Sequence, residues 1–154
     1  MTYSVPRDLV DAFYKVYAAR NAEKVAPFLA DDVEWRVIGP VDYLPFCGIH
    51  RGKAAVIDLM TRQVPSVLRV YSVVVESFLI DGDRAATLSR LHARRTEDGR
   101  VISYRIANFM RFSDGKVVEN LSMLDSFDAV EQVLGHPLSV QSDHKADKGN
   151  LFVV

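Results

Sequence analysis

Four long segments in the second half of the chain alternate between apolar and polar residues, and this alternation is the strongest constraint on the fold. The segments span residues 69–80, 84–95, 100–112 and 116–124. Successive side chains of a β-strand point to opposite faces, so a period of two predicts strands. The connections DGD, TEDG and SDG each contain a glycine, which tight hairpin turns need where φ is positive. The sequence therefore predicts an antiparallel meander of four strands.

The first half of the chain has helical periodicity instead. Between residues 5 and 20, apolar side chains recur at the spacing of one helical face. Further helices are predicted over 22–29, 52–64 and 128–135, and a strand over 31–39. The segment 39–52, GPVDYLPFCGIHRG, is predicted to be a loop because its glycines and prolines interrupt any period. Helices that pack on one face of an antiparallel sheet form an α+β domain.

Length and composition narrow the class of protein. The 154 residues suffice for one domain with a core. A formal net charge of −1, without any long run of like charges, argues against nucleic-acid binding. No apolar run is long enough for a membrane span, and the N-terminus MTYSVPRDLVDAF does not resemble a signal peptide. Cys47, the single cysteine, fits a reducing compartment, so we expect a cytoplasmic protein.

Four stretches of the sequence carry a family resemblance: FLADDVEW, GIHRGKAAV, NFMRFSDGKVVE and LDSFDAVEQVLG. In order and spacing they resemble the superfamily of nuclear transport factor 2, which includes ketosteroid isomerases and SnoaL-like polyketide cyclases. The resemblance implies a cone-shaped α+β barrel, in which a curved antiparallel sheet wraps around N-terminal helices and leaves a pocket open at one end. It also implies a homodimer through the outer sheet face. We expect residues 1–137 to form this SnoaL-like domain and residues 138–154 to be a mobile tail.

Asn108 is the unexpected residue on an otherwise apolar strand face. This face comprises Ile102, Tyr104, Ile106, Asn108, Met110 and Phe112. An unpaired carboxamide among apolar side chains costs on the order of a few kcal/mol. The Asn108 amide could donate to the carbonyl or enolate oxygen of a ligand. Alternatively, it could bond to its neighbours and serve only the core.

The resemblance to ketosteroid isomerases is informative through the groups that are missing. Those enzymes use a tyrosine donor, an aspartate base and a protonated aspartic acid. The family register implies Phe13 at the tyrosine position, Val37 at the base position and Asn108 at the position of the protonated acid. Because the base is absent, isomerisation by that mechanism is not expected. The paired carboxylates of epoxide hydrolases with this fold are also missing from the inward-facing positions.

Other residues are candidates for the missing base. The family register implies that the strand face with Arg90 and His92 turns toward the pocket. An imidazole titrates near neutral pH and suits proton transfer, whereas a guanidinium can hold a carboxylate or an enolate. The alternative is a solvated strand end near the TEDG turn. Asp42, in the loop over 39–52, is the other candidate base.

Further residues are predicted to contact a ligand. The candidates on helices and strands are Phe13, Tyr17, Trp35, Val37 and Tyr104. A buried phenol or indole needs a hydrogen-bond partner, and a ligand could supply it. The loop over 39–52 is expected to cover the mouth of the pocket, where Tyr43 and His50 could contact substrate. His50 could instead fix the loop.

These residues together predict a pocket for a small hydrophobic ligand with a carbonyl group. As an enzyme, the protein would move a proton next to that carbonyl, with His92 or Asp42 as the base and Asn108 stabilising the enolate. One alternative is a binding module without turnover. Another is a structural or interaction domain whose pocket is filled by its own side chains. No cofactor is expected, and no metal, because the histidines lack the spacing of metal ligands.

Overall fold

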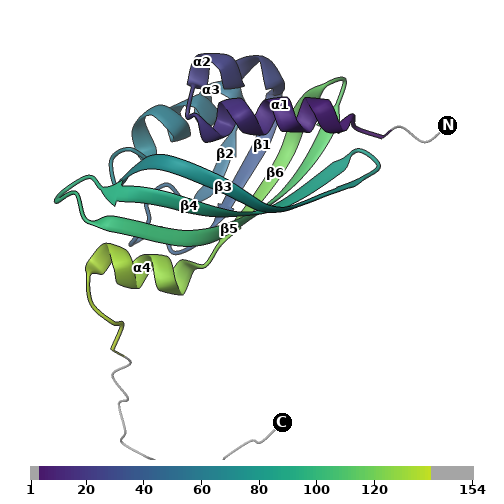
Figure 1. Cartoon of the computed structure of the whole chain (residues 1–154). Coiled ribbons are helices and arrows are strands. Elements are labelled where there is room, and N and C mark those ends of the chain that lie inside the picture. Colours follow the sequence, from purple (N-terminus) through teal and green to yellow (C-terminus); the bar gives the residue numbers. More distant parts are fainter. Residues whose placement is uncertain (1–3, 140–154) are drawn as a thin grey trace, which may run out of the picture.

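One curved sheet of six strands organises the molecule, in the order β2-β1-β6-β5-β4-β3 (Figure 1). The computed structural model describes residues 4–139. The strands are β1 Leu29–Ile38, β2 Gly48–Arg51, β3 Leu68–Asp81, β4 Arg84–Arg95, β5 Val101–Ser113 and β6 Lys116–Leu124. β1 and β6 pair in parallel, and all other neighbours pair antiparallel. The predicted α+β class is confirmed, with a curved, mixed sheet that stays open between β2 and β3.

The helices divide between the two sides of the sheet. They are α1 Arg7–Ala18, α2 Ala22–Val25, the 3₁₀-helix η1 Ala26–Phe28, α3 Lys53–Asp58, the π-helix η2 Leu59–Gln63 and α4 Ser126–Leu134. In Figure 1, α1, α2 and α3 lie together on one side, and α4 lies on the other side next to β5. The apolar stripe of α1 is turned toward the sheet, since Val10 and Phe13 are fully buried.

The predicted meander agrees with the structure to within one residue at each strand end. The predicted inward face of β5 is also found. Its buried residues, each exposed by 3% or less, are Ile102, Tyr104, Asn108, Met110 and Phe112. Large apolar side chains at alternate positions leave only one way to bury them, and that fixes the orientation of the strand.

Two segments differ from the sequence prediction. The loop predicted over 39–52 contains β2, which pairs with β1. Four residues are too few to show a period of two, and Gly48 and Gly52, with φ of 113° and 88°, conceal the strand among turn residues. The helix predicted over 52–64 changes at Leu59 into a π-helix.

α4 covers a part of β5 that no strand covers. β6 pairs with β5 only from Ile106 onward, so the first residues of β5 have a free edge. There the Gln132 carboxamide accepts a hydrogen bond from the Ser103 N–H over 2.8 Å and donates one to the Ser103 carbonyl over 2.7 Å. The side chain thus takes the place of a neighbouring strand. Asp125 caps α4, and Gly135 ends it in the left-handed conformation.

The expected tail, residues 138–154, lies outside the described part of the chain apart from its first two residues. Within residues 4–139, no helix combines the length and the apolar character that crossing a membrane requires.

Candidate functional site

A small cavity lies between the helices and the inner face of the sheet. Its volume is about 40 Å³, which is room for roughly three water molecules. Most of the side chains that line it are aliphatic or aromatic. Among residues 4–139, the lining residues with polar side-chain groups are Tyr17, Arg20, Trp35, Tyr104 and Ser122. The cavity therefore combines an apolar surface with a few hydrogen-bonding groups.

Tyr17, Trp35 and Tyr104 form what we call the aromatic wall of this cavity. The ring centroids of Tyr17 and Trp35 are 5.8 Å apart. Phe13 stacks on Tyr17 at 5.6 Å but does not itself line the cavity, whereas Val37 does. No side-chain hydrogen bond within residues 4–139 involves the phenol and indole groups of the aromatic wall. Their polar atoms are not fully buried, because the fully buried side-chain atoms without a partner in this part of the chain are Ser89 Oγ, Arg100 Nε and Asn120 Oδ1. The polar atoms of the wall are thus partly accessible, and they can donate hydrogen bonds to a molecule in the cavity.

The phenol of Tyr104 stays protonated at neutral pH and can therefore act as a donor. Burial raises the pKa of Tyr104, Tyr17 and Cys47 contribute in the same direction, and the charge of Arg20 opposes them. Burial also raises the pKa of Cys47 to about 11, so at neutral pH this thiol is not a nucleophile.

Beside the cavity, polar side chains cross the sheet in what we call the polar row. Thr87, Asn108 and Ser122 are register neighbours on β4, β5 and β6. Ser122 Oγ donates to Asn108 Oδ1 over 2.5 Å, and Asn120 Nδ2 donates to Ser122 Oγ over 2.8 Å. Tyr14 of α1 completes the row, its hydroxyl 2.5 Å from that of Thr87. All five side chains are buried.

Asn108 faces inward, but its carboxamide is already engaged. Its oxygen accepts the hydrogen bond from Ser122. Burial raises the pKa of Tyr14, and hydrogen bonds with Thr87 and Asn108 offset part of that rise. Of the polar row, only Ser122 lines the cavity. These partners fit the interpretation that Asn108 serves the core, and its role toward a ligand oxygen stays a prediction.

The face of β4 that was predicted to turn toward the pocket is the outer face. Leu91 lines the cavity, so its chain neighbours Arg90 and His92 point the other way. Arg90 Nε lies 3.3 Å from a carboxylate oxygen of Glu76, and the His92 ring stacks on Tyr71 with centroids 6.3 Å apart. The predicted orientation is wrong, because the charged side chains of this strand remain hydrated while the small ones between them face the core.

The loop residues predicted at the mouth do not line the cavity either. Asp42 and Tyr43 are exposed. His50 is buried, and its Nε2 lies 2.9 Å from the carbonyl oxygen of Phe46. This contact joins two residues of the segment 39–52 and so fixes the loop, in agreement with the alternative interpretation of His50. Phe46 itself lines the cavity. Among residues 4–139, no carboxylate or imidazole lines the cavity.

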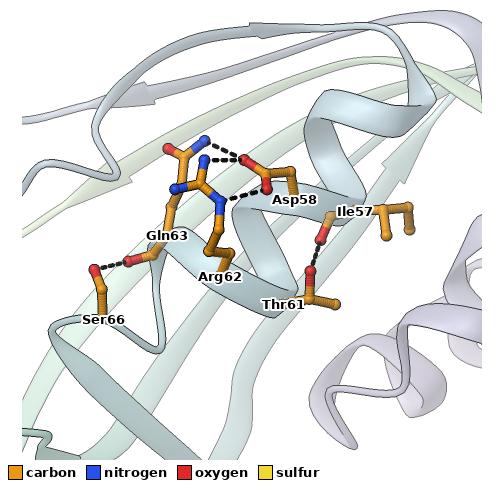
Figure 2. A network of polar contacts seen from close by, with 6 residues as sticks. All are labelled: Ile57, Asp58, Thr61, Arg62, Gln63 and Ser66. Carbon is orange, nitrogen blue, oxygen red and sulfur yellow. Dashed lines mark hydrogen bonds and ion pairs between the residues drawn. The ribbon is translucent and has the colours of Figure 1, made fainter.

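Another wall of the cavity is formed by η2, through Leu59 and Met60. Figure 2 shows the polar network that holds this turn on its outer side: Asp58 accepts hydrogen bonds from Arg62 over 2.7 and 2.8 Å and from Gln63 over 2.8 Å. The wider π-helical turn lets residues five apart meet. Hydrogen bonding to Arg62, and then to Gln63, lowers the pKa of Asp58 to about 2.

Arg20 is a lining residue that sequence reasoning missed. It follows α1 and stands three positions after Tyr17. Because Arg20 lies beyond the end of α1 and has a φ of 56°, helical spacing does not place it beside Tyr17, and the periodicity of the sequence carried no signal for it. Leu59 and Met60 were missed as lining residues because their position depends on the π-helical turn.

Comparison with known proteins agrees with this architecture. The family model described as the SnoaL-like domain matches residues 10–120. A solved structure from Rhodopseudomonas palustris, provisionally named as an isomerase, is 34% identical with a TM-score of 0.72. That alignment covers 83% of this chain and 94% of the other.

Two further solved structures are similar at lower identity. An NTF2-like protein of unknown function from Burkholderia pseudomallei is 20% identical, with a TM-score of 0.71 and coverage of 86% of this chain and 96% of that one. A hypothetical protein with a ketosteroid isomerase-like fold from Catenulispora acidiphila, in complex with trimethylamine, is 13% identical, with a TM-score of 0.68 and the same coverage. At these identities the likeness shows the fold. No curated protein matches the chain significantly.

Proposed function

Since the chain belongs to the family of SnoaL-like domains, we propose that it is a small-molecule-binding protein. The ligand that we propose is apolar and carries a carbonyl or a comparable acceptor oxygen. The observation that carries this proposal is the aromatic wall, which places Tyr17, Trp35 and Tyr104 on an apolar cavity without partners among residues 4–139. These donors favour a ligand that has an oxygen atom able to accept hydrogen bonds.

The energetics favour a ligand that accepts hydrogen bonds over a purely apolar one. A hydrogen bond made in a buried site contributes about 1 kcal/mol net, and a buried donor left without a partner costs about 1–3 kcal/mol. An apolar ligand that displaced water from the aromatic wall would leave its donors unpaired. A ligand with an acceptor oxygen replaces the water and also buries its apolar surface.

The volume of the cavity limits the size of the ligand. About 40 Å³ is free, whereas pockets for drug-sized ligands have roughly 300 Å³ or more. A steroid or a polyketide therefore needs a large rearrangement, and a ligand with a single ring needs a smaller one. Leu59 and Met60 of η2 are the side chains we expect to move, because Met60 has an unbranched, flexible side chain.

Proton transfer next to the ligand carbonyl is the second candidate function. The 34% identity to the Rhodopseudomonas palustris protein, provisionally named as an isomerase, favours it. Against it stands the lining of the cavity, which holds no carboxylate or imidazole from residues 4–139. Asn108 would stabilise the enolate only after giving up its bond to Ser122. We therefore rank binding without turnover first.

We also propose that the protein is a cytoplasmic homodimer that associates through the outer face of the sheet. Apolar side chains are exposed there on neighbouring strands: Leu79, Leu88, Phe109 and Met123. Contiguous exposed apolar surface is typical of interaction sites. Phe109→Glu should convert a dimer to a monomer in light scattering, whereas Tyr43→Glu, which changes an exposed aromatic residue of the loop, should not.

A ligand screen tests the binding proposal. Acetophenone, cyclohex-2-enone and 2-acetylnaphthalene serve as carbonyl probes, and ethylbenzene serves as the apolar control. We expect at least one carbonyl probe to raise the Tm of the protein more than ethylbenzene does, with the single-ring probes ahead of the larger one. Equal or absent shifts for all probes would contradict the proposal and favour a cavity filled by its own side chains.

The exchange of ligand protons for deuterium distinguishes the two candidate functions. A protein that transfers a proton accelerates the exchange of the methyl protons of acetophenone for deuterium, because that exchange passes through the enolate. We expect acetophenone to bind and its methyl protons to exchange no faster than in buffer alone. Acceleration that scales with protein concentration would move the assignment to the second candidate.

A further inference from the structure

We propose that the acceptor oxygen of the ligand is anionic and that Arg20 holds it. The ligand class is then a small apolar acid, either a carboxylic acid or an acidic enol, rather than a neutral ketone. This inference rests on the proposed function, because it requires that the cavity takes a ligand. It names the chemistry of the group that the cavity recognises.

The first observation is the setting of the Arg20 guanidinium. The residue is half-buried and lines the cavity. Its guanidinium carbon lies 5.3 Å from the centroid of the Tyr17 ring. No carboxylate from residues 4–139 lies within 4.0 Å of it, in contrast to Arg62, Arg90 and Arg111. Three other arginines also have no such partner within the described residues, but none of them lines the cavity: Arg69, Arg94 and Arg100. A half-buried cation without a counter-ion on an apolar cavity is suited to an anionic ligand.

The second observation is the backbone of Arg20. Its φ is 56°, and within residues 4–139 only Asp114 shares a positive φ without being glycine. The Arg20 N–H donates to the Tyr17 carbonyl, and the Asn21 N–H donates to the Val16 carbonyl. These two bonds define the helix ending at which glycine is the usual residue. An arginine here is strained, and strained residues occur more often at functional sites than elsewhere.

The third observation connects Arg20 to the aromatic wall. The charge of Arg20 lowers the pKa of Tyr104 against the larger effect of burial. Both residues line the same cavity. An anionic oxygen between them would accept charge-assisted hydrogen bonds from the guanidinium and a further bond from the neutral phenol. The apolar remainder of the ligand would contact the aliphatic side chains of the cavity.

The test compares two probes of nearly the same shape. Benzoate and acetophenone both carry one carbonyl on one ring, and they differ in that benzoate has a charged oxygen where acetophenone has a methyl group. Isothermal titration calorimetry at neutral pH gives their affinities for the wild type. We expect benzoate to bind about tenfold or more tightly, the effect of one charge-assisted interaction.

Variants assign that preference to Arg20. Arg20→Gly should remove the preference for benzoate and keep the affinity for acetophenone, and it should leave the Tm unchanged or higher because glycine accepts the positive φ without strain. Arg20→Lys should retain part of the preference. Arg7→Gln is the matched control, since Arg7 also lies over an aromatic ring, 4.7 Å from the centroid of Phe78, but does not line the cavity.

Each outcome bears on one of the two proposals. Acetophenone binding that equals or exceeds benzoate binding in the wild type would overturn the inference and leave the proposed function in place. A preference that survives Arg20→Gly, or that Arg7→Gln removes equally, would overturn it as well. An Arg20→Gly variant with a strongly lowered Tm would assign Arg20 a structural role. The absence of binding by both probes and by the carbonyl screen would remove the proposed function itself.

Discussion

The polar row and the aromatic wall lie in the same interior, but they differ in the hydrogen bonding of their polar groups. In the polar row, the hydroxyls of Tyr14 and Ser122 have side-chain partners at 2.5 Å, and Asn120 Oδ1 is the one buried side-chain atom of the row without a partner among residues 4–139. In the aromatic wall, Tyr104 is similarly buried, and its phenol has no hydrogen-bond partner among residues 4–139. Paired groups of this kind specify the packing of a core, and unpaired groups that line a cavity can bind a ligand. The polar row, of which only Ser122 lines the cavity, and the aromatic wall thus differ in how their polar groups are paired.

The largest loss of stability is expected when the hydrogen bonds of the polar row are interrupted at Asn108. Asn108→Leu keeps the shape of the side chain but leaves Ser122 and Tyr14 each without one partner. A buried polar group left unpaired costs about 1–3 kcal/mol, so the free energy of unfolding should fall by roughly 3 kcal/mol. Urea denaturation measures this loss. A loss well below about 1 kcal/mol would mean that the row is not structural.

A matched pair of hydroxyl deletions makes the comparison directly. Tyr14→Phe leaves the Thr87 hydroxyl without its partner, and the free energy of unfolding should fall by about 1–2 kcal/mol. Tyr104→Phe removes a hydroxyl that no side chain of residues 4–139 contacts by a hydrogen bond, so the stability should stay unchanged or rise. If urea denaturation showed equal losses for both, the distinction between the two regions would fail.

The same Tyr104→Phe variant should show its effect in binding. If the phenol donates to the ligand, the affinity for the tightest carbonyl probe should fall about fivefold, the equivalent of roughly 1 kcal/mol. Tyr14→Phe, measured by the same calorimetric titration in its folded state, serves as the control and should bind the probe like the wild type. An unchanged affinity in Tyr104→Phe would remove Tyr104 from the site.

The smallest effect on stability is expected from a change in the Asp58 network next to η2. Its side chains are hydrogen-bonded like those of the polar row, but they are partly exposed to solvent. Because the pKa of Asp58 is lowered to about 2, below its ordinary value of about 3.9, its contribution to stability is present above about pH 4 and is lost as the pH falls toward 2. Asp58→Asn should therefore lower the Tm slightly near neutral pH and not at all near pH 2. A Tm difference that is the same at both pH values would contradict this linkage.

β4 and β5 show which parts of this interior can be predicted from sequence. On β5, large apolar side chains such as Ile102, Met110 and Phe112 stand on one face, so the alternation decides the orientation. On β4, both faces carry small or polar residues, and the packing of α1 decides instead: Tyr14 meets Thr87, which turns Arg90 outward. The alternation of apolar and polar residues along β4 does not predict that contact.

The cavity itself was only partly predictable for the same reason. Tyr17, Trp35 and Tyr104 line it as predicted, because each belongs to an apolar stripe whose direction the sequence determines. Arg20 and Met60 line it because of how a helix ends and how a turn widens. These are local departures from regular geometry, and residue spacing does not encode them.

The bonds from Gln132 to Ser103 have a consequence for the behaviour of the protein in concentrated solution. An uncovered stretch of strand is a template on which a second, unfolded molecule can extend the sheet. By occupying both main-chain groups of Ser103, one carboxamide closes that template at its centre. We therefore expect Gln132, which does not line the cavity, to protect this strand edge against aggregation into fibrils.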